Sequence, residues 1–282
     1  MDCGHKNLPA CQARMRMRMA AAARVRVRDA PCRPFGTDDK HRLECYSLHV
    51  ILIGTSGFQY PEWKGTFYPP DLSTKKMLGF YSERFNSTES NYTFRRMPAE
   101  STLVNWAAQV PENFRFSLKA PQQITHFRQL RDCELVVQHF ADVAQALGPK
   151  LGAVLFQLPP SLHCDVTLLR DFLVVMPPNL KSAFEFRHES WFADEVFSTL
   201  QAHDAALCIG DSEKLHTPLN FTARHAYFRL RDEGYGEQDI ARWASVIREQ
   251  ESLRKDIYIY FKHEESGLGP QFAAALQKLL RD

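Results

Sequence analysis

The sequence predicts an α/β protein, more specifically a single-domain (β/α)8 TIM-type barrel. From about residue 49 to the end of the chain, short strand-like runs alternate with helical runs, which is typical of parallel βαβ units. Eight such units occupy ~230 residues, close to the ~250 residues of a closed barrel. No Gly-x-Gly-x-x-Gly or Gly-x-x-x-x-Gly-Lys-Ser/Thr motif follows a strand, so the nucleotide-binding sequences of open doubly wound sheets are missing.

The expected strands are short runs that are either apolar throughout or alternate in polarity. The run 153–158 is apolar and is followed by two prolines, which cannot donate to a continuing strand ladder. The run 115–119 alternates between apolar and polar residues, as expected for a strand with two different faces. The eight expected strands are residues 50–56, 88–93, 115–119, 153–158, 184–187, 206–210, 226–230 and 257–261.

Seven of these strands are followed by a run with helical periodicity. In the run 239–252, for example, Ile240, Trp243, Ala244 and Ile247 fall on one helical face. The exception is the sixth strand, which only a short connection separates from the seventh. The expected helices are residues 71–85, 100–110, 134–147, 166–176, 194–203, 239–252 and 270–280.

Residues 1–45 differ in composition from the expected barrel domain, residues 46–282. Two short alternating arginine repeats, at 15–19 and 24–28, surround an alanine run, and acidic residues are scarce. We expect a disordered, basic, low-complexity extension. A mitochondrial transit peptide and a basic arm for nucleic acid remain alternatives.

The overall composition restricts the class of protein. The formal net charge is only +2, so global charge does not require a nucleic-acid partner. Seven cysteines occur without a Cys-x-x-Cys pair, which fits free thiols in a reducing compartment and predicts a cytoplasmic protein, or a mitochondrial one if the extension is a transit peptide. The longest apolar runs have the length of strands, so we expect no membrane partner.

The segment 184–192 indicates where the chemistry lies. Phe184 and Phe186 alternate with Glu185 and Arg187, so the aromatic and the charged side chains take opposite faces of a strand. Because a strand between two helices is normally covered on both sides, the phenylalanines are expected to face the helices. The two charged side chains are then expected to point into the barrel, where they need partners.

The same parity applies to the other strands and places polar side chains at their carboxyl ends, where the sites of barrel enzymes lie. We predict three candidate catalytic acids and seven ligand-binding residues. The acids are Glu89, Glu185 and Asp211. The ligand-binding residues are Asn91, Lys119, Gln157, Arg187, Arg229, Arg231 and Lys262.

These ten residues contain five basic and three acidic groups, an excess that favours an anionic ligand. We expect an enzyme, namely a hydrolase, lyase or isomerase acting on an anionic or sugar-like small molecule. The alternative is a non-catalytic module that binds nucleic acid or protein through the cationic end of the barrel. An acid among several cations has a lowered pKa, so Glu185 is expected to be a base or an anchor, and Asp211 or Glu89 the acid.

Other chemistry has less support in the sequence. No His-Glu-x-x-His or similar spacing is present, so no metal site is predicted. Ser56 lies between glycines but outside a Gly-x-Ser-x-Gly motif, and no histidine is assigned beside it. The residues do not identify a cofactor.

Short motifs recur in order at the ends of the expected strands, in segments 53–58, 67–70, 114–120, 155–160, 184–188, 211–212 and 227–230. These motifs resemble those of the YecE-like family, the domain of unknown function numbered 72. The resemblance covers residues 49–282 and implies a TIM-type barrel but no particular reaction. Two dipeptides depart from the family pattern: Arg231-Asp232, where many members carry His-Gly, and Lys262-His263, where they carry Asn-Asn.

Overall fold

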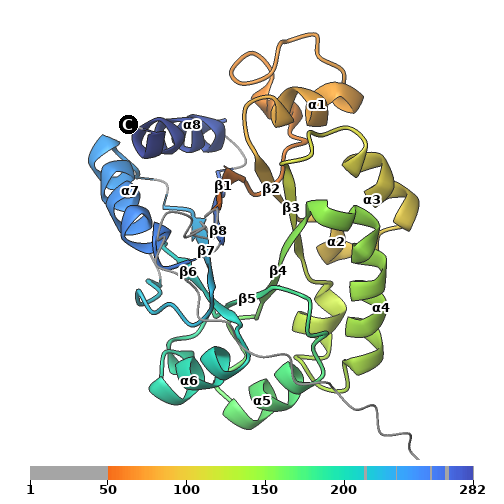
Figure 1. Cartoon of the computed structure of the whole chain (residues 1–282), viewed down its shortest axis with the longest axis vertical. Helices are drawn as coiled ribbons and strands as arrows, with labels where there is room; N and C mark the ends of the chain where they lie inside the picture. The colour runs from red at the N-terminus through yellow and green to blue at the C-terminus, as the bar shows by residue number, and fades with distance from the viewer. Residues whose placement is uncertain (1–49, 213–214, 233, 255, 264–266, 282) are drawn as a thin grey trace, which may run out of the picture. The chain divides into compact units, whose positions relative to one another are not determined.

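The computed structural model describes residues 50–212, 215–232, 234–254, 256–263 and 267–281. Within these residues, eight parallel strands form a nearly closed barrel surrounded by helices (Figure 1). The predicted (β/α)8 TIM-type fold is therefore confirmed. The basic segment 1–45 lies outside the described residues. Among those described, no helix combines the length and the apolar character needed to cross a membrane.

The strands follow one another around the barrel in the order β1-β8-β7-β6-β5-β4-β3-β2, and each neighbouring pair in this order is parallel. All carboxyl ends therefore meet at one end of the barrel, which we call the mouth. The strands are β1 Val50–Thr55, β2 Ser87–Ser90, β3 Arg115–Lys119, β4 Leu151–Gln157, β5 Ser182–Glu185, β6 Ala206–Gly210, β7 His225–Leu230 and β8 Asp256–Phe261.

The helices lie outside the strands, and no helix is found between β6 and β7 in the described part of that connection, as predicted. Several strands end one to three residues earlier than predicted, and the largest difference is in β2, which stops at Ser90 before residues 92–95 form a short helix. Thr93, in this short helix, is buried and donates to the Lys119 carbonyl. A β-branched residue directly after a strand is also typical of a strand, so the sequence pattern did not mark where β2 ends. The helices are α1 Met77–Ser82, α2 Tyr92–Arg95, α3 Glu100–Ala107, α4 Glu134–Ala144, α5 Val166–Val174, α6 Asp194–Ala202, α7 Glu237–Glu251 and α8 Leu268–Arg281.

The core has two layers, and strand parity separates them as expected. The outer layer, between strands and helices, contains Phe184 and Phe186, and the Phe186 ring stacks on Trp191 with centroids 4.6 Å apart. The inner layer fills the barrel with small residues opposite large ones, which lets side chains interdigitate at native density. Its members are Leu52, Ala153, Leu155, Ala183, Ala206, Cys208, Ala223, Tyr227, Tyr258 and Tyr260.

The barrel closes between β1 and β2 through side chains as well as backbone. The Asn86 side-chain amide donates to the Ile51 carbonyl and accepts from the Ile53 N–H, both at 2.8 Å. The buried Tyr81 hydroxyl accepts from the Thr55 N–H at 2.7 Å and donates to the Ser87 carbonyl at 3.1 Å. These two side chains therefore take the place of backbone ladder bonds at this seam.

Replacing Tyr81 with phenylalanine tests this closure. The variant leaves the Thr55 N–H and the Ser87 carbonyl without their hydroxyl partner inside the barrel wall. We expect a loss of about 1–3 kcal/mol in the free energy of unfolding, measured by urea denaturation, because buried backbone groups lose a hydrogen bond. An unchanged midpoint and slope would show that the seam does not depend on this hydroxyl.

Candidate functional site

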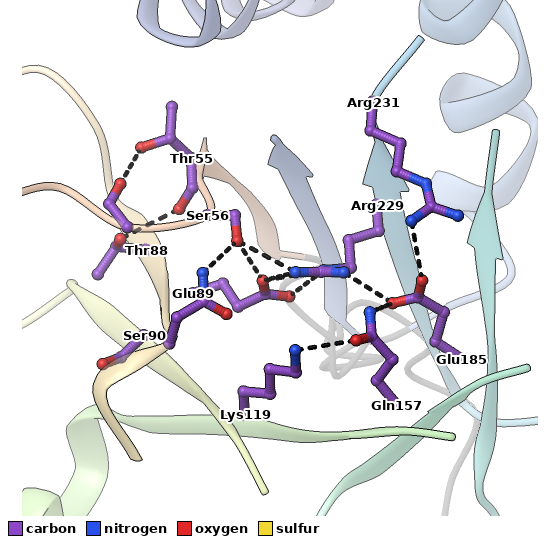
Figure 2. Close-up of polar contacts among 12 residues, drawn as sticks. Thr55, Ser56, Thr88, Glu89, Ser90, Lys119, Gln157, Glu185, Arg229 and Arg231 are labelled. Atoms are coloured by element: carbon purple, nitrogen blue, oxygen red, sulfur yellow. Dashed lines mark hydrogen bonds and ion pairs between the residues drawn. The ribbon is translucent and has the colours of Figure 1, made fainter. Parts of the chain in front are cut away.

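The centre of the mouth is the Arg229 guanidinium, which lies between the carboxylates of Glu89 and Glu185 (Figure 2). Arg229 comes from β7 and only 1% of its side chain is exposed. Its Nε donates to both oxygens of Glu89 at 2.9 and 3.0 Å, and one terminal nitrogen donates to Glu185 at 2.8 Å. The other terminal nitrogen donates to the Ser56 hydroxyl at 3.2 Å. One buried cation thus holds two buried anions from different strands.

Glu89, near the carboxyl end of β2, is fully buried and accepts hydrogen bonds at both oxygens. Ser56 donates to it at 2.5 Å and Tyr227 at 2.7 Å. Burial alone would raise the pKa of Glu89, but the charge and hydrogen bonds of Arg229, with those of Ser56 and Tyr227, lower it below the ordinary value. An ionised Glu89 disagrees with our expectation that it is a candidate proton donor.

Glu185, at the end of β5, faces three guanidinium groups. Besides Arg229, the Arg187 Nε lies 3.3 Å and an Arg231 terminal nitrogen 3.5 Å from its Oε1. The Gln157 amide donates to its Oε2 at 2.7 Å. Burial opposes ionisation, but the three arginines hold the pKa of Glu185 well below its usual range. This direction agrees with the expected role of a base or an anchor.

Lys119, at the end of β3, has a different environment. Its Nζ donates to the Gln157 Oε1 at 2.9 Å and lies 3.9 Å from the centroid of the Phe94 ring. Burial, followed by the positive charge of Arg229, lowers the pKa of Lys119 to about 8, although Glu89 and Glu185 act in the opposite direction. The amine is therefore far easier to deprotonate than that of an exposed lysine.

Asp211, just after β6, lies apart from this network and binds the strand ends around it. One carboxylate oxygen accepts from the Arg231 backbone N–H at 3.0 Å, and the other accepts from the Tyr235 hydroxyl. The Arg231 side chain connects the two parts, since its Nε donates to the Asp211 carbonyl at 3.2 Å while its terminal nitrogen faces Glu185. Burial and the Asp211 carboxylate raise the pKa of Tyr235, so its phenol is protonated.

The two remaining predicted residues lie at the mouth. The Asn91 amide donates to the Ser56 hydroxyl at 3.0 Å, and its Oδ1 is buried with no hydrogen-bond partner in the described structure. Lys262 follows β8 and its backbone N–H donates to the Leu230 carbonyl at 2.8 Å. Its side-chain charge contributes to the lowered pKa of Lys119. All ten predicted residues therefore lie at the mouth. Eight of them are connected through the hydrogen bonds and ion pairs around Arg229. Asp211 is joined to these eight through Arg231, and the charge of Lys262 acts on Lys119.

Sequence reasoning missed four residues of this site. Ser56, set aside for want of a histidine, instead donates to a carboxylate. Tyr227 lies two residues before Arg229 on the same strand, so alternation predicts that its side chain also points into the barrel. Phe94 and His126 come from connections after β2 and β3, whose position no periodicity predicts; their rings lie 5.0 Å apart. Burial, Lys119 and Arg187 lower the pKa of His126.

In the described segments, no group of three or more His, Cys, Asp or Glu side chains is arranged to hold a metal ion.

The fold and the mouth define a TIM-barrel protein with a buried polar network at the carboxyl ends of its strands. Residues 52–282 match the family described as "Protein of unknown function DUF72". The chain belongs to this family.

Individual relatives agree with that assignment. The chain is 29% identical to the UPF0759 protein YecE of Escherichia coli over 145 residues, which is 51% of each chain; this match thus spans about half the length of YecE. It is 24% identical to the UPF0759 protein YunF of Bacillus subtilis over 258 residues, or 77% of this chain and 90% of YunF.

Solved structures of the family have the same fold. A DUF72 protein from Thermotoga maritima superposes with a TM-score of 0.76 and 25% identity, covering 83% of this chain and all of that one. A DUF72 protein from Enterococcus faecalis gives a TM-score of 0.71 with 20% identity, covering 83% of this chain and 96% of that chain.

Proposed function

We propose that this protein is an enzyme of the hydrolase, lyase or isomerase type that acts on a small anionic molecule at the mouth of the barrel. The observation that carries the proposal is the convergence of Arg187, Arg229 and Arg231 on the single carboxylate of Glu185. The predicted site also contains two more acids, Glu89 and Asp211, and two more bases, Lys119 and Lys262. Its five basic and three acidic side chains leave an excess of two positive charges.

The guanidinium groups differ in their availability to a ligand. Arg229 is buried and its donors are used by Glu89, Glu185 and Ser56. Arg187 and Arg231 keep 30% and 19% of their side chains exposed, and their contacts to Glu185 are longer. A guanidinium carries five N–H donors, so these two arginines retain donors for the carboxylate or phosphate group of a substrate.

The alternative is a non-catalytic module that binds nucleic acid or protein. Surfaces that bind single-stranded nucleic acid combine a basic groove with aromatic rings on which bases stack. Among the described residues, Phe127 is the only phenylalanine, tyrosine or tryptophan that is largely exposed. The convergence of charge on one buried carboxylate fits a compact anion better than an extended strand.

The test is binding of inorganic phosphate and citrate by isothermal titration calorimetry. We expect the double variant Arg187→Gln, Arg231→Gln to weaken binding about tenfold or more, because charge-assisted hydrogen bonds to the anion are lost. Arg224→Gln is the matched control, since Arg224 is exposed beside Asp204 at the opposite end of the barrel and should leave binding unchanged.

Turnover is tested on the same proteins by incubation with a metabolite extract and mass spectrometry, in which the wild type should consume an anionic compound that the double variant leaves intact. Absence of small-anion binding by the wild type, or tight binding of a single-stranded oligonucleotide without any consumption of a metabolite, would overturn the proposal.

A further inference from the structure

Lys119 is the one buried lysine of the described chain whose amine has only neutral partners. Its Nζ contacts the Gln157 amide oxygen at 2.9 Å and the Phe94 ring at 3.9 Å. No carboxylate of a described residue forms a salt bridge with it. By contrast, Lys150 is also buried but lies 3.1 Å from the Glu112 carboxylate and donates to two backbone carbonyls. Lys119 therefore lacks the direct carboxylate partner that stabilises the charged amine of Lys150.

The position of Lys119 matches that of a group that meets substrate. It is the last residue of β3, on the inward parity, at the end of the barrel where β-strand residues form the sites of this fold. Figure 2 shows its Nζ pointing toward Gln157 and the Arg229 network. Gln157 accepts from Lys119 with its oxygen and donates to Glu185 with its nitrogen, so its amide is fixed at both ends. The amine is thereby held in one place.

We propose that Lys119 is a nucleophile that forms an imine with the aldehyde or ketone group of a small anionic substrate, whose acidic group binds Arg187 and Arg231. This inference rests on the proposed function and names the substrate class, an oxo acid or a phosphorylated sugar in its carbonyl form. A desolvated lysine among cationic groups is a suitable amine for such covalent chemistry.

The step balances without an oxidant, a reductant or a metal. The lone pair of the neutral Lys119 amine attacks the carbonyl carbon, and the electrons of the C=O bond move to oxygen, which takes a proton. The nitrogen gives up one of its two protons to solvent, which leaves a neutral carbinolamine. Protonation of the carbinolamine hydroxyl by solvent and its loss as water leave a protonated C=N bond to Nζ, and release of that last proton gives the neutral imine. The overall change is amine plus carbonyl to imine plus water. The protonated imine then withdraws electrons from the neighbouring carbon, as lyase and isomerase reactions require.

The charged groups that face Lys119 come from several elements. Burial has the largest effect and favours the neutral amine, as do the charges of Arg229 on β7 and Lys262 after β8. Glu89 of β2 and Glu185 of β5 favour the charged amine but have the smaller effect, so the pKa is about 8. His126 on the neighbouring connection has a lowered pKa and so adds no charge near neutral pH. We therefore expect imine formation to become faster as pH rises toward about 8 and then to level off.

The experiment traps the imine by reduction. The full-length protein is incubated with glyoxylate, pyruvate or glyceraldehyde 3-phosphate and sodium cyanoborohydride, and the adduct is located by intact mass and peptide mapping. We expect one adduct at Lys119 with at least one probe, formed at least tenfold faster than at Lys181, a half-exposed lysine paired with Asp256. Lys119→Arg should abolish that adduct, because a guanidinium cannot form the imine, whereas Arg224→Gln, the control at the opposite end of the barrel, should be labelled at Lys119 like the wild type.

The outcomes separate the two proposals. If wild-type protein binds phosphate but none of the three probes labels Lys119, the imine is overturned and the anion site stands. Labelling of Lys119 and Lys181 at equal rates would also overturn it, since the reaction would then be that of any lysine. If phosphate does not bind, the proposed function itself fails. A Lys119→Arg protein that is unfolded by circular dichroism is replaced by Lys119→Gln for the same comparison.

Discussion

Replacing Arg229 with methionine is expected to lower the free energy of unfolding by about 3–5 kcal/mol, because a buried ion pair that loses one partner leaves an uncompensated charge. Here the loss affects two carboxylates at once. Glu89 is fully buried and Glu185 is 3% exposed, and both lie within 3.0 Å of Arg229 nitrogens. Urea denaturation followed by circular dichroism measures the change.

Arg187→Met is the matched control for this prediction. Arg187 contacts the same carboxylate, Glu185, but at 3.3 Å and with 30% of its side chain exposed, so solvent screens the pair and the loss should stay below about 1 kcal/mol. A double variant, Arg229→Met with Glu89→Gln, should recover part of the stability. Equal losses for the two single variants would show that burial of the Arg229 network is not what stabilises the mouth.

Strand periodicity could predict the fold and much of the site because both follow from local alternation. In β5, alternation alone assigned Glu185 to the interior and Phe184 to the helix side, and the structure has them so. The same logic brought Lys119 and Gln157 to one end of the barrel, because parallel strands share the direction of their carboxyl ends. The excess of basic over acidic residues among the ten predicted site residues then favoured an anionic ligand.

The pairing of these groups could not be predicted, because it depends on distances between strands that are far apart in sequence. Tyr235 lies in a connection without periodicity, yet its hydroxyl donates to Asp211. Ser56 was judged by its neighbours in the chain, whereas its partner Glu89 comes from the next strand. The seam is a further case, since no pattern marks Tyr81 as the side chain that joins β1 to β2.

The geometry also changes how the two buried acids are understood. A glycosidase needs one carboxyl group that stays protonated, but Arg229 lowers the pKa of both Glu89 and Glu185. Both act as fixed negative charges that orient the guanidinium. The amine of Lys119, in contrast, has a pKa that burial and Arg229 lower to about 8, which is why we expect amine chemistry rather than paired-carboxylate chemistry.

Replacing Glu185 with glutamine is expected to destabilise the protein by about 2–3 kcal/mol near neutral pH, because Arg229 loses one of its two charged acceptors. The effect should depend on pH. The folded pKa of Glu185 lies below its ordinary value of 4.5, so its contribution is present above about 4.5 and is lost as pH falls toward the folded pKa. The difference between wild type and variant should therefore shrink on acidification from about pH 7 to about pH 3.

Asp204→Asn separates this effect from general acid denaturation. Asp204 also has a lowered pKa, from the hydrogen bonds and charge of Arg224, but its side chain is 39% exposed, so solvent weakens the pair and its replacement should change stability little at either pH. Unfolding curves for the three proteins across the same pH range give the comparison. A Glu185→Gln difference that stays constant with pH would mean that Glu185 is not ionised in the folded state, and the anion that anchors the three arginines would have to be another group.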